Sequence, residues 1–319
     1  MRALLSIAFF SGCSLWVGDP LDKSMAMPGA TPSEVPSKSS DPGPIDRDWK
    51  LEPSGVNVVL MAVWGSSATD VYAVGESGTI LHSNGDGSWK TQAYDFPGPE
   101  YVSVWGASER DVYVGGTVVV HSAGDGRWQE VRAAKRANLW GSGGQDIYLA
   151  DQGNVSRSSG DGKWEISYAA SGNMDMRSVF GTGTGDVYAL GDEYILRSGG
   201  DNLWAILYHS PTADLFHLWA SSPQNYYVAR LSRGVLHQRP QLSMIELADK
   251  SILSIFGSSA ADVYAVGEGG QLYHTTGDGN WIDLTAHSAT NQTLFAVWAD
   301  HLGSAYAVGR NGTIVHRKP

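Results

Sequence analysis

The sequence predicts an all-β fold in which seven units of four strands close into a ring, and two observations carry this prediction. First, a Trp-Gly pair at residues 64–65, or a close relative of it, recurs every 35 to 42 residues, a period typical of propeller blades. Second, Tyr72 has a counterpart in every one of these units. The aromatic anchors of the seven units are Trp64, Trp105, Trp140, Phe180, Trp219, Phe256 and Trp298.

Each unit contains short apolar runs rich in β-branched and aromatic residues, bounded by Gly, Asp, Asn or Ser. This is the chemistry of strands and hairpins rather than of helices. A four-stranded unit cannot bury its apolar face alone, so neighbouring units must stack. Seven such sheets arranged radially make a seven-bladed β-propeller, with residues 47–319 as one domain.

The seventh unit ends at Pro319 without a closing strand that contains Trp. Residues 48–52, which include Trp49, look like the closing strand around Trp89. We therefore predict that the N-terminal strand completes the last blade, so that the ring has no unpaired first and last edges. The closing strand of unit five lacks the tryptophan and is only weakly similar to the others, with residues 244–247 corresponding to residues 281–284 of unit six.

The N-terminal segment predicts export and a lipid anchor. Met1 and Arg2 precede an apolar run at residues 3–10 that suits the core of a secretory signal. Ser11 and Gly12 then precede Cys13, the single cysteine of the chain, and this resembles the lipobox of bacterial lipoproteins. The resemblance implies a signal peptide at 1–12, palmitate on Cys13 and a location on the bacterial cell envelope, on the outer membrane because Ser14 follows the cysteine. The alternatives are an ordinary signal peptide with a fortuitous cysteine and a misassigned start.

Residues 13–46 then form a tether rich in Pro, Ser and Gly, with few large apolar side chains. Anchor, tether and compact domain together would present the propeller, expected to be a monomer, away from a membrane that it contacts only through lipid. The net charge of −11 without a Lys/Arg cluster argues against a nucleic-acid partner.

A second resemblance concerns the repeat itself. Residues 78–83 followed by Asp86, Gly87 and Trp89 resemble the repeat of the BNR/Asp-box propellers and of the photosystem II assembly-factor propellers. The resemblance covers residues 47–319. It implies the propeller fold and, for the Asp-box proteins, a glycoside hydrolase or lyase activity.

Residues that recur in most blades are interpreted as structural. Five histidines share one position, which Arg157 and Arg197 fill in blades three and four, and histidines spread around a ring cannot converge on one metal ion. The aspartates that open the second strands are interpreted as turn residues that accept hydrogen bonds from the backbone. We therefore expect no metal and no cofactor. The histidines are His82, His121, His237, His274 and His316, and the aspartates are Asp70, Asp111, Asp146, Asp186 and Asp262.

Residues that break the repeat are the better candidates for function. Two places before the anchor, small residues are the rule, and Asn138 and His217 are the exceptions. Two further positions of the first strands add three candidates. Tyr101 and Arg136 lie four places before their anchors, and Arg177 lies three places before its anchor. Because the first strands of a propeller line its axis, these five could gather at one mouth of the channel and bind an anionic ligand through the two arginines. The alternative is drift at solvated positions.

The connections into the first strands vary in sequence, and loops on a rigid scaffold often carry binding specificity. Phe96 and Tyr168 are among the exposed candidates there. The hairpins between second and third strands should lie on the same face.

Two classes of function remain open. The first is a non-enzymatic binding or scaffold propeller with a protein or glycan partner. The second is a glycoside hydrolase or lyase of the Asp-box type. No Gly-x-Ser-x-Gly elbow and no His-x-x-x-His spacing is present. We therefore favour binding over catalysis.

Overall fold

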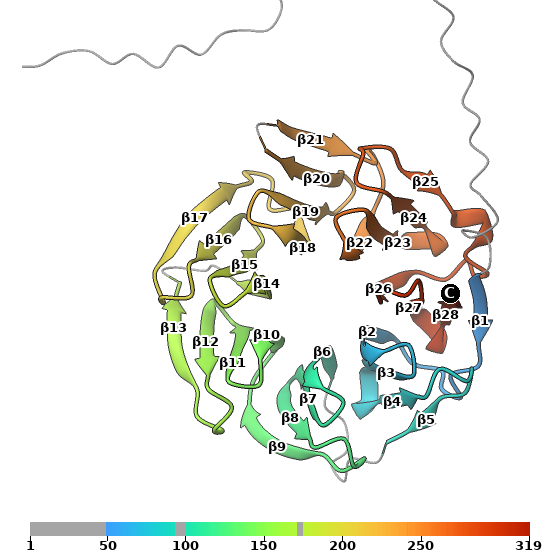
Figure 1. The fold of residues 1–319 in the computed structure, drawn as a ribbon, viewed down its shortest axis with the longest axis horizontal. Coiled ribbons are helices and arrows are strands. Elements are labelled where there is room, and N and C mark those ends of the chain that lie inside the picture. Colours follow the sequence, from blue (N-terminus) through green and yellow to red (C-terminus); the bar gives the residue numbers. More distant parts are fainter. Residues whose placement is uncertain (1–48, 93–99, 171–174, 241) are drawn as a thin grey trace, which may run out of the picture. The chain divides into compact units, whose positions relative to one another are not determined.

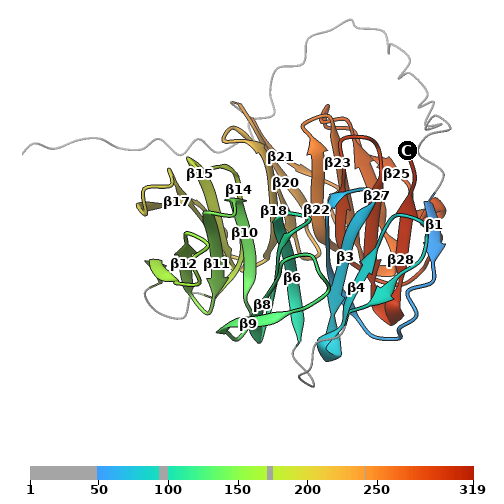
Figure 2. The same ribbon diagram turned by 60° about the horizontal axis from the view of Figure 1, so that its bottom comes forward.

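The computed structural model describes residues 49–92, 100–170, 175–240 and 242–319. These residues form seven antiparallel sheets of four strands, arranged as blades around a central channel (Figure 1). Within each blade the strands run between the two faces of the ring (Figure 2). The predicted seven-bladed β-propeller is therefore confirmed. No helix of the described residues is long and apolar enough to cross a membrane.

Blades one to six are meanders in which consecutive strands pair, and in every blade the first strand after the connection from the preceding blade is innermost (Figure 1). Blades one to three consist of β2 (Leu60–Ser67), β3 (Asp70–Gly75), β4 (Ile80–Ser83), β5 (Lys90–Thr91); β6 (Tyr101–Ser108), β7 (Asp111–Gly116), β8 (Val118–Ser122), β9 (Gln129–Ala133); and β10 (Asn138–Gly143), β11 (Asp146–Asp151), β12 (Asn154–Ser158), β13 (Glu165–Ala169). Blades four and five consist of β14 (Met176–Gly183), β15 (Asp186–Gly191), β16 (Tyr194–Ser198), β17 (Trp204–His209); and β18 (Leu215–Ser222), β19 (Asn225–Arg230), β20 (Gly234–Arg239), β21 (Leu242–Glu246).

Blades six and seven complete the ring with β22 (Ile252–Ser259), β23 (Asp262–Gly267), β24 (Leu272–Thr275), β25 (Ile282–Asp283); and β26 (Leu294–Ala299), β27 (Ala305–Gly309), β28 (Ile314–Arg317), β1 (Trp49–Glu52). The helical elements of the described residues are single 3-10 turns: η2 (Glu76–Gly78), η3 (Glu268–Gly270), η4 (Thr285–His287) and η5 (Arg310–Gly312).

The N-terminal strand closes the seventh blade, as predicted. β1 pairs with β28, with Trp49 opposite Arg317 and Glu52 opposite Ile314. Oε1 of Glu52 accepts a hydrogen bond from Nδ1 of His316 in the same blade at 2.8 Å. Oε2 of Glu52 accepts from Nε1 of Trp89 in blade one at 2.9 Å. The carboxylate of Glu52 therefore links blade seven to blade one.

The recurring aspartates have a role different from the predicted one. Asp70 does not serve mainly the backbone, because its Oδ1 lies 2.7 Å from Nε2 of His82 and its Oδ2 accepts from Oγ of Ser66 at 2.5 Å. The imidazole of His82 in turn packs on the ring of Tyr72, with centroids 4.5 Å apart. Burial alone would raise the pKa of Asp70, but the hydrogen bonds from His82 and Ser66 outweigh it and lower that pKa. The recurring Asp and His positions therefore build a network inside each blade.

The closing strand of blade five is shifted by one residue from the predicted correspondence. Met244 pairs with His237, whereas Ile282 is the residue that pairs with the equivalent His274. Ser243 therefore takes the position of the tryptophans. Because blade five has no indole at this position, a groove of about 490 Å³ remains between blades four and five. The groove is lined by Leu207, Pro223, Gln224, Tyr226, Gln238, Arg239 and Pro240.

Candidate functional site: the central channel

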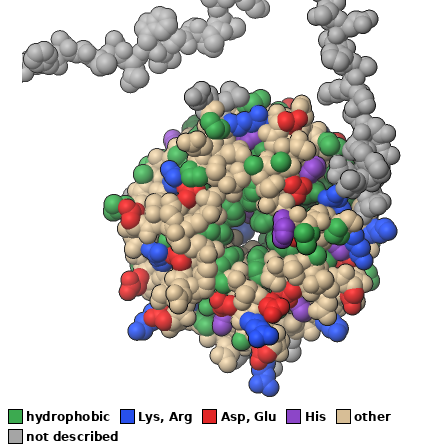
Figure 3. Space-filling view, in the orientation of Figure 1, with side chains coloured by type: hydrophobic (Ala, Val, Ile, Leu, Met, Phe, Trp, Pro, Cys, Tyr) green, Lys and Arg blue, Asp and Glu red, His purple; other side chains and the backbone are tan. Residues whose placement is uncertain are grey.

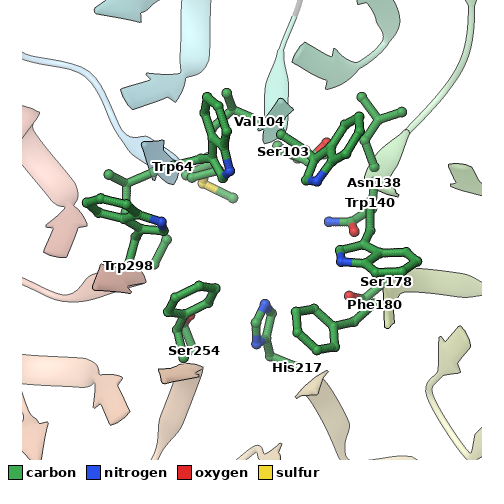
Figure 4. Close-up of a pocket in the computed structure, with 18 of the residues that line it drawn as sticks. Trp64, Ser103, Val104, Asn138, Trp140, Ser178, Phe180, His217, Ser254 and Trp298 are labelled. Carbon is green, nitrogen blue, oxygen red and sulfur yellow. The ribbon is translucent and has the colours of Figure 1, made fainter. Parts of the chain in front are cut away.

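The first strands of the blades enclose a cavity of about 150 Å³ on the propeller axis. Hydrophobic side chains surround the central opening, and most charged side chains on this face lie away from it (Figure 3). Aromatic anchors form part of the wall, and the positions two residues before them point toward the axis (Figure 4). The lining includes the anchors Trp64, Trp105, Trp140, Phe180, Phe256 and Trp298.

A polar arc runs along one side of this channel. In blades two to six the position two before the anchor is polar, whereas blades seven and one carry alanine there. The polar residues are Ser103, Asn138, Ser178, His217 and Ser254, and the alanines are Ala296 and Ala62. The three serines are 4%, 5% and 2% exposed, so only the longer side chains of Asn138 and His217 reach the lumen.

Asn138, the first residue of β10, joins blades three and four. Its Oδ1 accepts a hydrogen bond from the backbone N–H of Val179 at 3.3 Å. The amide nitrogen points toward the centre of the channel (Figure 4). Asn138 can therefore donate to a molecule in the lumen.

His217, in β18, points its imidazole toward the same space (Figure 4). Its Nδ1 is buried and has no hydrogen-bond partner among the described residues. Burial lowers the pKa of His217 to about 4, and the nearby backbone of Ile255, which would raise this pKa, opposes the effect of burial only partly. The imidazole is therefore neutral at pH 7 and available as a hydrogen-bonding group.

The structure brings together only two of the five residues predicted at the channel mouth. Tyr101 is wrong as a channel residue, because it is 0% exposed and lies in the core between blades one and two. Arg136 is exposed in the loop before β10, and Arg177 forms an ion pair with Asp192. Neither arginine lines the cavity, so the predicted anionic ligand would meet no cationic side chain there.

The two loop candidates also fall outside the site. Phe96 lies outside the described residues. Tyr168 belongs to the outer strand β13 and not to a loop, and its ring packs against Trp204 with centroids 6.2 Å apart. Tyr168 is therefore half-buried in the interface between blades three and four.

The loops into the first strands and the hairpins between second and third strands lie on one face, as expected. The backbone N–H of Glu76 donates to the carbonyl of Val59, and that of Arg310 donates to the carbonyl of Thr293. Charged hairpin residues are engaged in the same way. Oδ1 of Asp151 accepts from the N–H of Arg136 at 3.2 Å. In the part of the chain that the structure describes, no three His, Cys, Asp or Glu residues are grouped as metal ligands.

The Ser, His and Asp residues of the blades do not form a nucleophile with its base. Asp262 lies in the middle, 2.5 Å from Oγ of Ser258 and 2.8 Å from Nε2 of His274. A Ser-His-Asp triad instead requires the histidine between the other two. These groups therefore stabilise the blade rather than activate a serine.

The comparisons with known proteins define a class by fold. No family model matches the chain, and no curated protein matches it by sequence. Among solved structures, YCF48 bound to D1 peptide is 13% identical, with 85% of this chain and 97% of that chain covered and a TM-score of 0.71. A catalytically inactive variant of virginiamycin B lyase from Staphylococcus aureus, with quinupristin, is 10% identical, with 84% and 99% covered and a TM-score of 0.73.

The WD40 propeller domain of Doa1 is 11% identical, with 85% and 97% covered and a TM-score of 0.63. These similarities establish that the chain is a β-propeller. Since the class includes both peptide-binding proteins and lyases, the fold alone leaves the function open.

Proposed function

We propose that this chain is a non-enzymatic binding propeller of the bacterial cell envelope, which receives a protein partner at the mouth of its channel. The observation that carries this proposal is the contrast between recurring and single-copy polar residues. Recurring residues such as Asp70 and His82 bind one another inside their blade. Asn138 and His217 occur once each and direct polar atoms into the lumen.

A protein partner is favoured because propellers of this fold include YCF48 with a bound D1 peptide and a WD40 domain. A glycoside hydrolase is disfavoured by the residues present. Such enzymes use a pair of carboxylates on either side of the scissile bond. None of the described residues that line the channel is Asp or Glu.

Comparative co-purification tests the proposal. The bait is the intact propeller, and the variant is Asn138→Ser/His217→Ser, which installs the residue that Ser103, Ser178 and Ser254 supply in other blades. The control is Lys90→Ala on the exposed outer strand β5. We expect quantitative mass spectrometry to show a protein retained by the wild type and the control and lost by the double variant. Identical capture by all three would contradict the proposal, and a glycan array run in parallel would reveal a glycan ligand instead.

Envelope anchoring rests on Cys13, which lies outside the described residues. Acylation there would leave a tether of 33 residues, 14–46, before the propeller. An extended tether of this length reaches on the order of 100 Å at ~3.1 Å per residue. Metabolic labelling with a palmitate analogue should mark the wild type, and persistent labelling of Cys13→Ser would refute acylation at this residue.

A lyase activity is the second candidate, because His217 faces the channel of a fold shared with virginiamycin B lyase. A neutral imidazole could act as a base, although its lowered pKa makes it a weak one at pH 7. Incubation with quinupristin separates the two candidates. Loss of intact quinupristin with the wild type but not with His217→Ser would establish the lyase.

A further inference from the structure

We infer that the channel selects an uncharged group that accepts a hydrogen bond, a carboxamide or a hydroxyl attached to an apolar part. This inference rests on the proposed function, because it specifies the side chain that a partner would insert. The evidence is the charge, the polarity and the size of the cavity.

The cavity offers no counter-charge. Among the described residues that line it, none is Asp, Glu, Lys or Arg. A charged group entering this space would lose hydration without gaining an ion pair, which costs far more than burying a hydrogen-bonded neutral group. The wall therefore offers neither an anion nor a cation an ion pair that would offset its lost hydration.

The two polar side chains that reach the lumen, Asn138 and His217, lie on one side of it. Asn138 presents its amide nitrogen as a donor, because its oxygen is already bonded to Val179. His217 adds an imidazole that can donate or accept, depending on its tautomer. On the other side of the lumen lie Ala62 and Ala296. A ligand that matches this cross-section has one edge that forms hydrogen bonds and one apolar edge.

The aromatic wall lies next to the polar pair. Trp140 follows Asn138 along β10, and Phe180 projects beside His217 (Figure 4). A planar group held by Asn138 and His217 would contact these rings. The cavity of about 150 Å³ is smaller than the roughly 300–1,000 Å³ of pockets that hold drug-sized ligands. The site therefore fits one side chain or a molecule of similar size.

Three probes of similar size and different charge test the inference: benzamide, benzoate and benzylammonium. Binding is measured by NMR on the full propeller at pH 7, from shifts of the His217 imidazole. We expect benzamide to bind at least about tenfold more tightly than either ion, a difference of about 1.4 kcal/mol. Asn138→Ser should weaken benzamide binding, with a cooperative unfolding transition showing that the variant is folded although the bond to Val179 is lost. Gln224→Ala, in the turn between β18 and β19 and outside the cavity, should have no effect.

Benzoate or benzylammonium binding as tightly as benzamide would overturn the inference. So would benzamide binding that is unaffected by Asn138→Ser, or no shift of His217 with benzamide up to its solubility limit. These outcomes would not affect the capture of a protein partner in co-purification, so the proposed protein-binding function would stand. Conversely, benzamide binding with no captured partner would reject the proposed protein-binding function while keeping the selectivity of the channel.

Discussion

A β-carbon on Gly106 would lie 2.5 Å from Cη2 of Trp64, the anchor of the preceding blade. The indole of one blade thus covers the backbone of the next. The same contact recurs wherever the preceding anchor is Trp: Trp105 with Gly141, Trp140 with Gly181, Trp219 with Gly257 and Trp298 with Gly65. Where the preceding anchor is Phe180 or Phe256, the position holds Ala220 or Ala299 instead. The size of one residue is matched to the size of the other all around the ring.

Gly106→Ala should therefore destabilise the propeller by about 1–3 kcal/mol, because the added methyl group overpacks the contact with Trp64. Trp64→Phe should relieve this clash, as Phe180 does for Ala220. In a double-mutant cycle measured by urea unfolding, we expect a favourable coupling energy of about 1 kcal/mol. Additive effects of the two substitutions would show that the two positions are not matched.

Removal of residues 1–46 should leave the propeller stable, whereas removal of 1–53 should lower its melting temperature sharply. The longer deletion removes β1, and with it Trp49 in the core and the bonds of Glu52 to His316 and Trp89. Loss of the buried Trp49 side chain alone is expected to cost ~3–5 kcal/mol. Equal melting temperatures would contradict closure by the N-terminal strand.

Acid should weaken the ring at Glu52. Burial alone would raise the pKa of this carboxyl, but hydrogen bonds from His316 and Trp89 outweigh it and lower the pKa below 4.5. Because the pKa of Glu52 is lower in the folded than in the unfolded state, its ionised form stabilises the protein when the pH is above the unfolded-state pKa. This stabilisation is lost as the pH falls through the folded-state pKa. Urea unfolding from about pH 6 to about pH 3 should therefore show a smaller decline for Glu52→Gln than for the wild type. Parallel curves would refute the ionised role of Glu52.

Ser243→Trp should stabilise the fifth blade. The other six blades fill this position with an indole. In blades one, two, four and six the indole N–H donates to a residue at the outer edge of the preceding blade, as Trp204 donates to Ser167 at 2.9 Å. At the groove between blades four and five, Leu207 occupies the position that Ser167 holds in blade three, and its side chain cannot accept a hydrogen bond. Both the indole donor and its acceptor are therefore absent there. The double variant Ser243→Trp/Leu207→Gln should gain about 0.5–2 kcal/mol in thermal unfolding. No gain from either variant would show that the groove differs in shape from the indole.

The repeat was sufficient to predict the blades, the closure and the structural role of the recurring histidines, since each depends on a pattern repeated several times. Tyr101 was misplaced for a physical reason. Side chains two residues apart share a face of a regular strand, but the register of β6 shifts between Tyr101 and Ser103. The shift turns Tyr101 into the core while Ser103 faces the channel. The residues four places before the other anchors are mostly apolar, as in Leu60 and Leu215, and this could have identified Tyr101 as a core residue.

The channel's aromatic wall was missed because its members were correctly assigned to packing between blades. Trp140 and Phe180 serve both purposes, and a repeat pattern cannot reveal the second one. Similarly, the pairing of Arg177 with Asp192 depends on the hairpin after β15, which lies in the same blade but is separated from Arg177 in sequence.

Whether the channel is an uncharged site is tested most directly by the titration of His217. Its imidazole can be followed by NMR from neutral to acid pH in the wild type and identified by its absence in His217→Ser. We expect His217 to titrate with a pKa of about 4, because burial opposes its protonation. A pKa at the ordinary value of 6.5 would mean that water or an acidic group reaches the imidazole, and the uncharged channel would then be rejected.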